Sequence, residues 1–414
     1  MSVPVGSVVP VESVVLGVDC ADVAGLAGCG EVPGVVVLVV EPGGVAGAEV
    51  VRVLEVVRGV LAEPGLGGVR LVVVTRGGMA EVPDPASAAV WGLVRSAQTE
   101  YPGRVVLVDV DSDVSVGSLR GAVSVALGCG EPQVAVRGEG VLVPRLLRVG
   151  GVSPEGSAVG VVGPVWDAVG TVLVTGASGV LAGVVARHLV VEQGVRRLVL
   201  VSRSGAGAEG LVAAGAEDVS FVLCDVADRE GMAEVLAGVA EEYPLRGVVH
   251  AAGVLDDGVL GGLSGERLAG VLRPKVDGVL VLDELTRGLD LSAFVVFSSV
   301  AGVVGTAGQA AYAAANAFMD ALMAVRRSEG LAGTSLAWGL WAAEGGMGGG
   351  LRERDLERVS RMGIVPMPVA EALGLFDAAM GLGRACVVPA RLDMAALRER
   401  AAQDDLPAIL RGLV

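Results

Sequence analysis

The sequence predicts an α/β protein built from two doubly wound parallel sheets, and three observations carry this prediction. Continuous Val-rich runs such as VVVLVV at 35–40 indicate strands that are buried on both faces, as in parallel sheets. Segments with helical spacing of apolar residues follow these runs, so strand and helix alternate. The alternation stops at a stretch rich in Gly, Ser and Pro at 149–160 and then begins again, which indicates two subdomains.

The first subdomain, expected over residues 1–150, contains a simple succession of elements. We predict strands at 35–40, 71–74 and 105–111, separated by helices at 48–63 and 85–102. This half has no Gly-rich phosphate loop and no cluster of side chains suited to catalysis. We therefore expect a structural subdomain that binds no cofactor.

Composition and charge exclude several classes of function. The 414 residues are 52% apolar and carry a net charge of −16, so we expect a folded chain with no nucleic-acid partner and no membrane attachment. Residues 291–319 carry no charge, but they contain too many polar side chains for a membrane span. Five scattered Cys and two His predict no metal site and suit a cytoplasmic location. The first 15 residues lack the basic start of a secretory signal.

The second subdomain, expected over residues 151–414, opens with a strand, a Gly-rich turn and a helix. The strand Thr171–Thr175 leads into TGASGVLAG, and the helix continues to residue 191. Such a turn lets backbone amides approach a pyrophosphate at the positive N-terminus of the helix. We predict a Rossmann-like dinucleotide site, whose contacts in this turn are Thr175, Gly176, Ser178, Gly179, Val180 and Leu181.

Further cofactor contacts are expected where the next strands end. An NAD-binding fold usually has an acidic residue after its second strand, whereas the strand at 197–201 is followed by Ser202 and Arg203. A guanidinium suits the 2′-phosphate of NADP, so we predict NADPH as the cofactor. The remaining predicted contacts follow the next two strands and are Asp225, Val226, Ala251, Ala252 and Gly253.

Five motifs, in this order, resemble the short-chain dehydrogenase/reductase superfamily: TGASGVLAG, LVSRSG, CDVAD, HAAGVLDD and FSSVAGVVGTAGQAAYAAAN. More closely, nearly the whole chain resembles the ketoreductase domain of a bacterial modular (type I) polyketide synthase. In that family a truncated, cofactor-free Rossmann-like subdomain precedes the catalytic one. The resemblance implies NADPH-dependent reduction of a β-keto group on a thioester bound to an acyl carrier protein. It also implies the other domains of a synthase module as partners.

A Tyr, a Ser, a Lys and an Asn form the expected catalytic set. Tyr312 would protonate the ketone oxygen as hydride adds to carbon, and Ser299 would donate a second hydrogen bond to that oxygen. Because an unperturbed Tyr has a pKa near ~10, a nearby cation is needed. Asn316 follows Tyr312 by one helical turn, where most short-chain dehydrogenases have Lys. The resemblance implies that Lys275 supplies this charge and binds the nicotinamide ribose, while Asn316 orders the site or holds a relay water.

Stereochemistry is expected to depend on the segment Leu255, Asp256 and Asp257. In the family an LDD motif here marks the B-type, which gives the (3R)-hydroxyl, and A-type members typically carry a Trp where Val304 stands. The resemblance thus implies a (3R)-β-hydroxyacyl product, with or without epimerisation of a 2-methyl group. A Gly-rich stretch and an amphipathic helix near 343–363 predict a substrate lid, in which Met347 would contact the acyl chain.

Two other functions remain open on the sequence alone. A redox-silent scaffold or epimerase domain of the same kind of synthase would be expected to lack a member of the catalytic set, and all four are present. A free-standing metabolic dehydrogenase would not need a first half without a cofactor.

Overall fold

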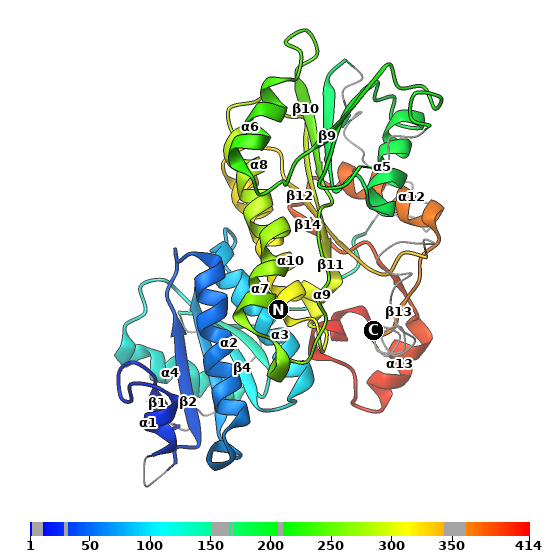
Figure 1. Cartoon of the computed structure of the whole chain (residues 1–414). Helices are drawn as coiled ribbons and strands as arrows, with labels where there is room; N and C mark the ends of the chain where they lie inside the picture. Colours follow the sequence, from blue (N-terminus) through cyan, green and yellow to red (C-terminus); the bar gives the residue numbers. More distant parts are fainter. Residues whose placement is uncertain are drawn as a thin grey trace.

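Two parallel sheets, one in each half of the chain, form the framework of the protein (Figure 1). The computed structural model describes residues 1, 11–28, 32–138, 140–150, 165–166, 169–205, 210–342 and 362–414. We call the part with the first sheet the N-terminal subdomain and the part with the second sheet the C-terminal subdomain. The predicted α/β fold with two Rossmann-like sheets is confirmed.

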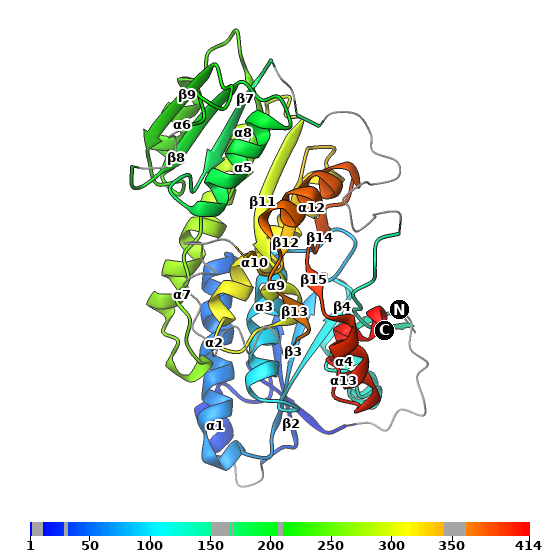
Figure 2. The same ribbon diagram turned by 90° about the vertical axis from the view of Figure 1, so that its right-hand side faces the viewer.

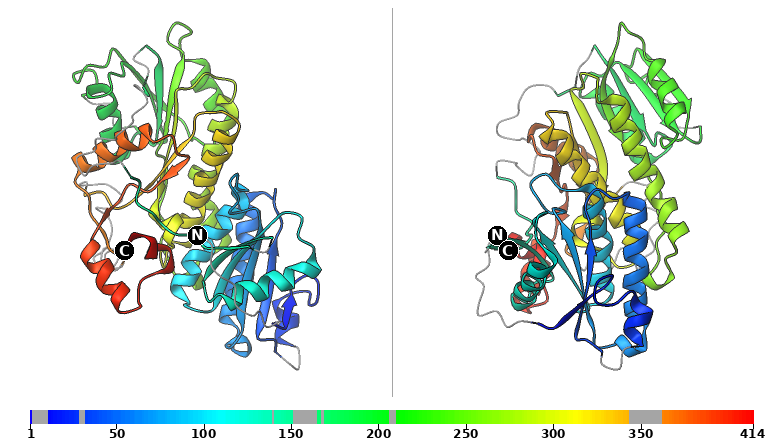
Figure 3. Two further views of the ribbon diagram at one scale, coloured as in Figure 1. Left: turned by 180° about the vertical axis from the view of Figure 1, so that it is seen from behind. Right: turned by 90° about the vertical axis from the view of Figure 1, so that its left-hand side faces the viewer.

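The N-terminal subdomain contains a six-stranded sheet in the order β1-β2-β3-β4-β5-β6, in which only the β5–β6 pairing is antiparallel. Its strands are β1 (Ser13–Val15), β2 (Val35–Val40), β3 (Arg70–Arg76), β4 (Val105–Val110), β5 (Gln133–Arg137) and β6 (Gly140–Leu142). Its helices are α1 (Val23–Ala27), α2 (Ala46–Ala62), α3 (Pro85–Glu100) and α4 (Val116–Gly128). Helices α2 and α3 cover one face of this sheet and α4 covers the other (Figure 3).

The C-terminal subdomain has a seven-stranded sheet in the order β14-β12-β11-β10-β7-β8-β9, with every pairing parallel. Its strands are β7 (Thr171–Thr175), β8 (Arg197–Ser202), β9 (Asp218–Leu223), β10 (Leu245–His250), β11 (Ala293–Ser299), β12 (Thr334–Trp338) and β14 (Cys386–Val387). The chain reverses direction across the sheet between β7 and β10, and in such folds ligands bind at this switch point.

Helices cover both faces of the second sheet. On one face lie α5 (Val180–Val191) and α12 (Val369–Gly381), which Figure 2 shows in front of the strands. On the other face lie α6 (Arg229–Ala237), α7 (Gly265–Leu272), α8 (Gly278–Thr286) and α10 (Ala310–Ser328). The short helix α9 (Val300–Val304) follows β11. Because both faces are covered, the inner strands such as β7 and β8 are largely apolar, whereas the edge strand β9 is partly exposed.

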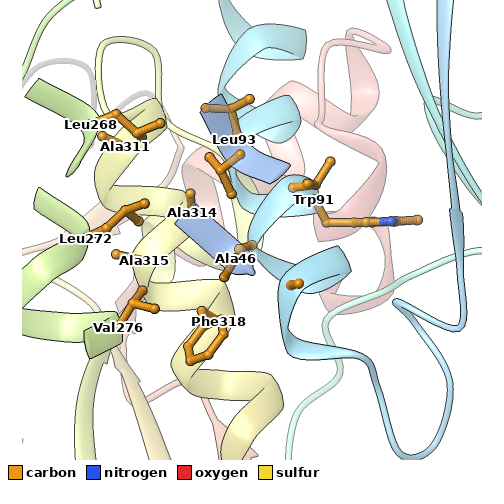
Figure 4. Packing of buried hydrophobic residues seen from close by; sticks show 14 of the residues in the cluster. Ala46, Trp91, Leu93, Leu268, Leu272, Val276, Ala311, Ala314, Ala315 and Phe318 are labelled. Carbon is orange, nitrogen blue, oxygen red and sulfur yellow. The ribbon is translucent and has the colours of Figure 1, made fainter. Parts of the chain in front are cut away.

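The two subdomains meet where α3 packs against α10 (Figure 4). A single apolar core runs through this contact and includes Leu93 of α3 together with Ala314 and Phe318 of α10. The closest approach is at Gly92, where a Cβ atom would lie 2.3 Å from the carbonyl oxygen of Ala313. The helix that carries Tyr312 therefore rests directly on the subdomain in which we expect no cofactor.

The end of the chain also contacts the N-terminal subdomain. A two-stranded antiparallel sheet of β13 (Ile364–Val365) and β15 (Arg391–Leu392) precedes α13 (Met394–Ala402). Beyond α13, the amide of Leu146 donates a hydrogen bond of 2.8 Å to the carbonyl of Ile409.

Several expectations fall on residues outside the described ranges. These are the connector from 151 onward, Met347, and all but the last two residues of the expected lid at 343–363. Within the described ranges, no helix combines the length and apolar character needed to cross a membrane. The same residues contain no group of three or more His, Cys, Asp or Glu that could hold a metal ion.

Candidate active site

A cavity of about 390 Å³ opens at the carboxyl ends of β7, β8, β10 and β11. Of the predicted site residues that the structure describes, all but four line it, and the four are Thr175, Asp256, Asp257 and Asn316. The predicted residues in its wall are Gly176, Ser178, Gly179, Val180, Leu181, Ser202, Arg203, Asp225, Val226, Ala251, Ala252, Gly253, Leu255, Lys275, Ser299 and Tyr312. The fold thus brings together residues up to 136 positions apart in one concave site.

The glycine turn after β7 is shaped for close approach of the backbone to a ligand. Gly176 has a φ of +72°, and a Cβ atom there would lie 2.7 Å from the amide nitrogen of Ala252. A larger residue is therefore excluded both by conformation and by contact with the turn after β10. Helix α5 begins after Gly179, and no side chain caps its first turn. The first residues of α5, Val180 and Leu181, line the cavity, so the uncapped start of the helix lies beside it, which suits a phosphate.

At the end of β8, a hydroxyl and a guanidinium follow one another. The hydroxyl of Ser202 donates to the carbonyl of Ser204, which fixes the turn around Arg203. Arg203 is exposed, lines the cavity and makes no ion pair within the described part of the chain. Asp225, after β9, pairs with Arg273 at 3.2 Å and accepts a hydrogen bond from the amide of Ala227.

Tyr312 lies in the first turn of α10, with its ring next to a buried cation. The ammonium nitrogen of Lys275 is 5.1 Å from the centre of the Tyr312 ring. Burial raises the pKa of Tyr312, while hydrogen bonding to the side chains of Asn316 and Ser299 lowers it. The phenol is therefore protonated at neutral pH, as a proton donor must be.

Lys275 is the sole lysine in the sequence and is 2% exposed. It lies in a π-helical turn, Arg273–Asp277, that joins α7 to α8, and π-turns of this kind often occur at functional sites. Its ammonium donates to the carbonyl oxygen of Phe297 at 2.9 Å. Burial lowers the pKa of Lys275 to about 7, although the charge of Asp320 acts in the opposite direction.

Ser299 and Asn316 have different positions around Tyr312. Ser299 ends β11, and its hydroxyl accepts a hydrogen bond from the amide of Ala301 at the start of α9, which holds the side chain beside the cavity. Asn316 is fully buried one turn below Tyr312, and its amide group donates to the Tyr312 carbonyl at 2.8 Å. Its side-chain oxygen has no hydrogen-bond partner among the described residues, so it remains able to accept one.

Thr175 is fully buried beneath the glycine turn and does not reach the cavity. Its hydroxyl lies 2.7 Å from Nδ1 of His250. Burial and the charge of Lys275 lower the pKa of His250 to about 3, so this imidazole is neutral at physiological pH. Both side chains support the turns that line the site.

Of the segment 255–257 after β10, only the first residue lines the cavity, and side-chain contacts hold the other two. Leu255 lines the cavity, whereas Asp256 forms a bidentate ion pair with Arg267, whose shorter contact is 2.5 Å. Asp257 accepts a hydrogen bond of 3.0 Å from the side-chain amide of Gln309. Val304 is partly buried against the apolar cluster formed by the end of the chain.

Sequence reasoning missed several residues of the site. Asp320 follows Tyr312 by eight residues and Asn316 by four, so helical spacing places all three on one face of α10 and was an available signal. Its carboxylate accepts a hydrogen bond of 2.5 Å from Ser335, and burial raises its pKa. Asp320 itself does not line the cavity, and the lining residues that were not predicted include Pro274, Thr306, Gln309, Trp338 and Trp341.

The fold and the site together define a reductase of the short-chain dehydrogenase class, with a Tyr, a Ser and a Lys in the same cavity as the glycine turn. Residues 170–343 match the family described as "KR domain". Residues 2–146 match "Polyketide synthase extender module SpnB, Rossmann fold domain". The chain belongs to the ketoreductases of modular polyketide synthases.

Solved structures and curated proteins agree with this assignment. The chain is similar to an A1-type ketoreductase structure, with a TM-score of 0.82, 31% identity, and coverage of 100% of this chain and 96% of that one. It is also similar to an A-type ketoreductase from a modular polyketide synthase, with a TM-score of 0.80, 34% identity, and coverage of 95% and 86%. Polyketide synthase GfsE of Streptomyces halstedii is 54% identical over 380 residues, which are 91% of this chain and 10% of that protein. The chain therefore spans a small part of such relatives.

Proposed function

We propose that this ketoreductase uses NADPH to reduce the β-keto group of a polyketide thioester carried by an acyl carrier protein. The observation that carries the proposal is that Tyr312, Ser299 and Lys275 line the same cavity as the glycine turn after β7. The carrier protein and the other domains of a synthase module are the proposed partners, and the cytoplasm is the proposed location.

The chain's own groups fit NADPH. Gly176 admits the backbone approach, the uncapped start of α5 offers amides to the pyrophosphate, and Arg203 offers a guanidinium to the 2′-phosphate. When bound, NADPH supplies the hydride that adds to the ketone carbon and leaves as NADP⁺.

Tyr312 transfers its proton to the ketone oxygen as hydride adds to the carbon, so that the C=O double bond becomes a C–O single bond with one new C–H and one new O–H bond. Ser299 donates a hydrogen bond to the same oxygen as negative charge develops on it. The positive charge of Lys275 stabilises the phenolate that Tyr312 becomes, and a proton from the Lys275 side of the site restores the phenol.

We further propose that the product is the (3R)-β-hydroxyacyl thioester. The support is the resemblance of Leu255–Asp257 to the B-type motif, together with Val304 in place of a Trp. The ion pair of Asp256 with Arg267 and the bond from Gln309 to Asp257 fix the segment at the edge of the cavity. Substrate guided along this segment would present one face of its ketone to the hydride.

The alternative is a redox-silent scaffold or an epimerase that exchanges the proton at C2 without net reduction. One experiment separates these functions: a carrier-bound 2-methyl-3-ketoacyl thioester is incubated with NADPH, and the products are resolved by chiral chromatography. We expect NADPH oxidation and one (3R) product, whose configuration at C2 reports epimerisation. Absence of any hydroxyacyl product would overturn the reductase proposal, and a mainly (3S) product would overturn the stereochemical one.

A further inference from the structure

One carboxylate of the N-terminal subdomain, that of Glu100, binds two segments at the edge of the active site. Glu100 is the last residue of α3, and each of its two oxygens accepts a hydrogen bond from a backbone amide of the C-terminal subdomain. Oε2 accepts from Leu260 and Oε1 accepts from Gly308, both at 2.8 Å. These partners are 160 and 208 residues away in the sequence.

The two amides belong to two segments that each contribute residues to the lining of the cavity. We call these the 255–263 segment and the 305–309 turn. Leu255 of the first and Gln309 of the second line the cavity, and the turn leads directly into the helix of Tyr312. The segments also contact each other, because Gly258 donates to the carbonyl of Gly308 at 2.8 Å and Gln309 donates to Asp257.

Further contacts from the same subdomain bind these segments or helix α9, which precedes the 305–309 turn. Arg58 of α2 donates a hydrogen bond of 2.8 Å to the carbonyl of Leu263. Thr99 donates to the carbonyl of Gly305 at 3.2 Å, and Arg95 donates to the carbonyl of Gly302 at 2.7 Å. Glu100 differs from these residues because it alone among them bonds both segments at once.

We infer that Glu100 is a positioning residue of the reductase: it sets the separation of the 255–263 segment from the 305–309 turn, and thereby the orientation of the ketone against Tyr312. This inference rests on the proposed function and adds a selectivity role for the N-terminal subdomain. Two amides need two acceptor oxygens in one rigid group, and a carboxylate provides them. Glutamine has one acceptor oxygen, so it would leave one segment released.

The test compares Glu100→Gln and Glu100→Ala with Gln98→Ala, a control on the same helix. Gln98 bonds the carbonyls of Val105 and Pro132, both within its own subdomain. With a carrier-bound 2-methyl-3-ketoacyl thioester, we expect both Glu100 variants to raise the KM for this substrate and to lower the product diastereomer ratio, each about tenfold. We expect kcat to change less than KM, and the Kd for NADPH, measured by fluorescence, to stay unchanged. Gln98→Ala should keep the wild-type ratio even if it unfolds at a lower temperature.

A second measurement does not depend on turnover. Amide hydrogen exchange in the Glu100 variants should increase in the 255–263 segment and the 305–309 turn, and stay constant at Gly176–Leu181. An unchanged diastereomer ratio and KM in Glu100→Ala would overturn the inference and leave Glu100 a purely structural contact. Failure of the proposed function is a separate result, because it would appear as inactivity of the wild-type protein toward the thioester.

Discussion

The two subdomains differ in what accepts the backbone amides of a turn between a parallel strand and the next helix. In the N-terminal subdomain, the helix after β3 is capped by the carboxylate of Asp84. The turn between them donates the amides of Gly78 and Met79 to Asp109 at 2.8 and 3.2 Å. In the C-terminal subdomain, the helix after β7 has no side-chain cap, and its glycine turn lines the cavity. In the N-terminal subdomain, carboxylates of the chain itself accept hydrogen bonds from the amides of the turn and the helix start. In the C-terminal subdomain, the corresponding kind of position remains available to an anionic ligand.

Asp109 is the carboxylate that accepts the amides of the turn after β3 in the N-terminal subdomain. It is fully buried, and besides the two amides it binds the Thr75 hydroxyl at 2.5 Å and the guanidinium of Arg137. The indole of Trp91 in turn donates to Thr75 at 2.8 Å. A glycine-containing turn after a strand is therefore no evidence of a nucleotide site when a buried carboxylate already accepts its amides.

The largest expected effect is a loss of catalysis in the C-terminal subdomain, without a loss of folding. Tyr312→Phe removes the phenolic proton and little volume, so reductase kcat should fall by about 10²–10⁴-fold because general acid catalysis is lost. The Kd for NADPH and the unfolding midpoint should stay near their wild-type values. Tyr243→Phe is the matched control, since that partly exposed phenol donates to Glu242 and does not line the cavity. Near-normal turnover of Tyr312→Phe would show that another group donates the proton.

The next largest effect is a loss of stability in the N-terminal subdomain. Asp109→Ala leaves Arg137, Thr75 and two amides without their shared acceptor, so the free energy of unfolding should fall by about 3–5 kcal/mol. Urea denaturation followed by tryptophan fluorescence measures this, and Trp91 lies within the affected network. Asp111→Ala is the control, because Asp111 also pairs with Arg137 but is exposed, and its loss should cost under about 1 kcal/mol. Equal losses in both variants would contradict the assigned role of Asp109.

Substitutions of Arg203 test which cofactor, NADPH or NADH, the C-terminal subdomain binds. Arg203→Ala should weaken NADPH binding by about 1.5–3 kcal/mol and leave NADH binding nearly unchanged, because NADH has no 2′-phosphate. The ratio of KM values for the two cofactors measures the effect. Arg203→Lys should give an intermediate ratio, since it keeps the charge and loses the bidentate geometry. Equal use of both cofactors by the wild-type protein would refute this account.

The smallest effect concerns the buried cation of the second subdomain. The pKa of Lys275 is about 7 in the folded protein, against 10.5 for the ordinary side chain. Between pH 7 and pH 10.5, therefore, the side chain is protonated in the unfolded chain and has lost its proton in the folded chain. Stability from this group therefore rises with pH, by at most about 1.4 kcal/mol per pH unit, and is lost again as pH falls through 7. Lys275→Met should flatten the rise of unfolding free energy between pH 7.5 and 8.5.

A direct reading of the same pKa is available because the chain has a single lysine. Protein made with isotope-labelled lysine should give one side-chain NMR signal, which we expect to titrate near pH 7. Titration near 10.5 would mean that the ammonium is solvated and not buried against Phe297.

The sequence predicted the elements and the cavity wall well, because both depend on local pattern. Strand β7 was predicted with the bounds observed, and the glycine turn, Tyr312 and Ser299 lie where strand ends and helical spacing place them. Contacts between subdomains were not predictable in this way: nothing local marks Glu100 as the acceptor of amides 160 and 208 residues away. Thr175 was assigned to the cofactor by its place in the motif, yet it faces His250 within the core.

The close approach of Gly92 to Ala313 has a consequence for hybrid synthases. The two helices fit at backbone distance, so neither surface can change without a matching change in the other. A recombinant enzyme joined between the two subdomains would pair α3 from one parent with α10 from another. Any side chain at position 92 would push on the helix that carries Tyr312, so productive crossover points lie outside both subdomains, where the pair is transplanted intact.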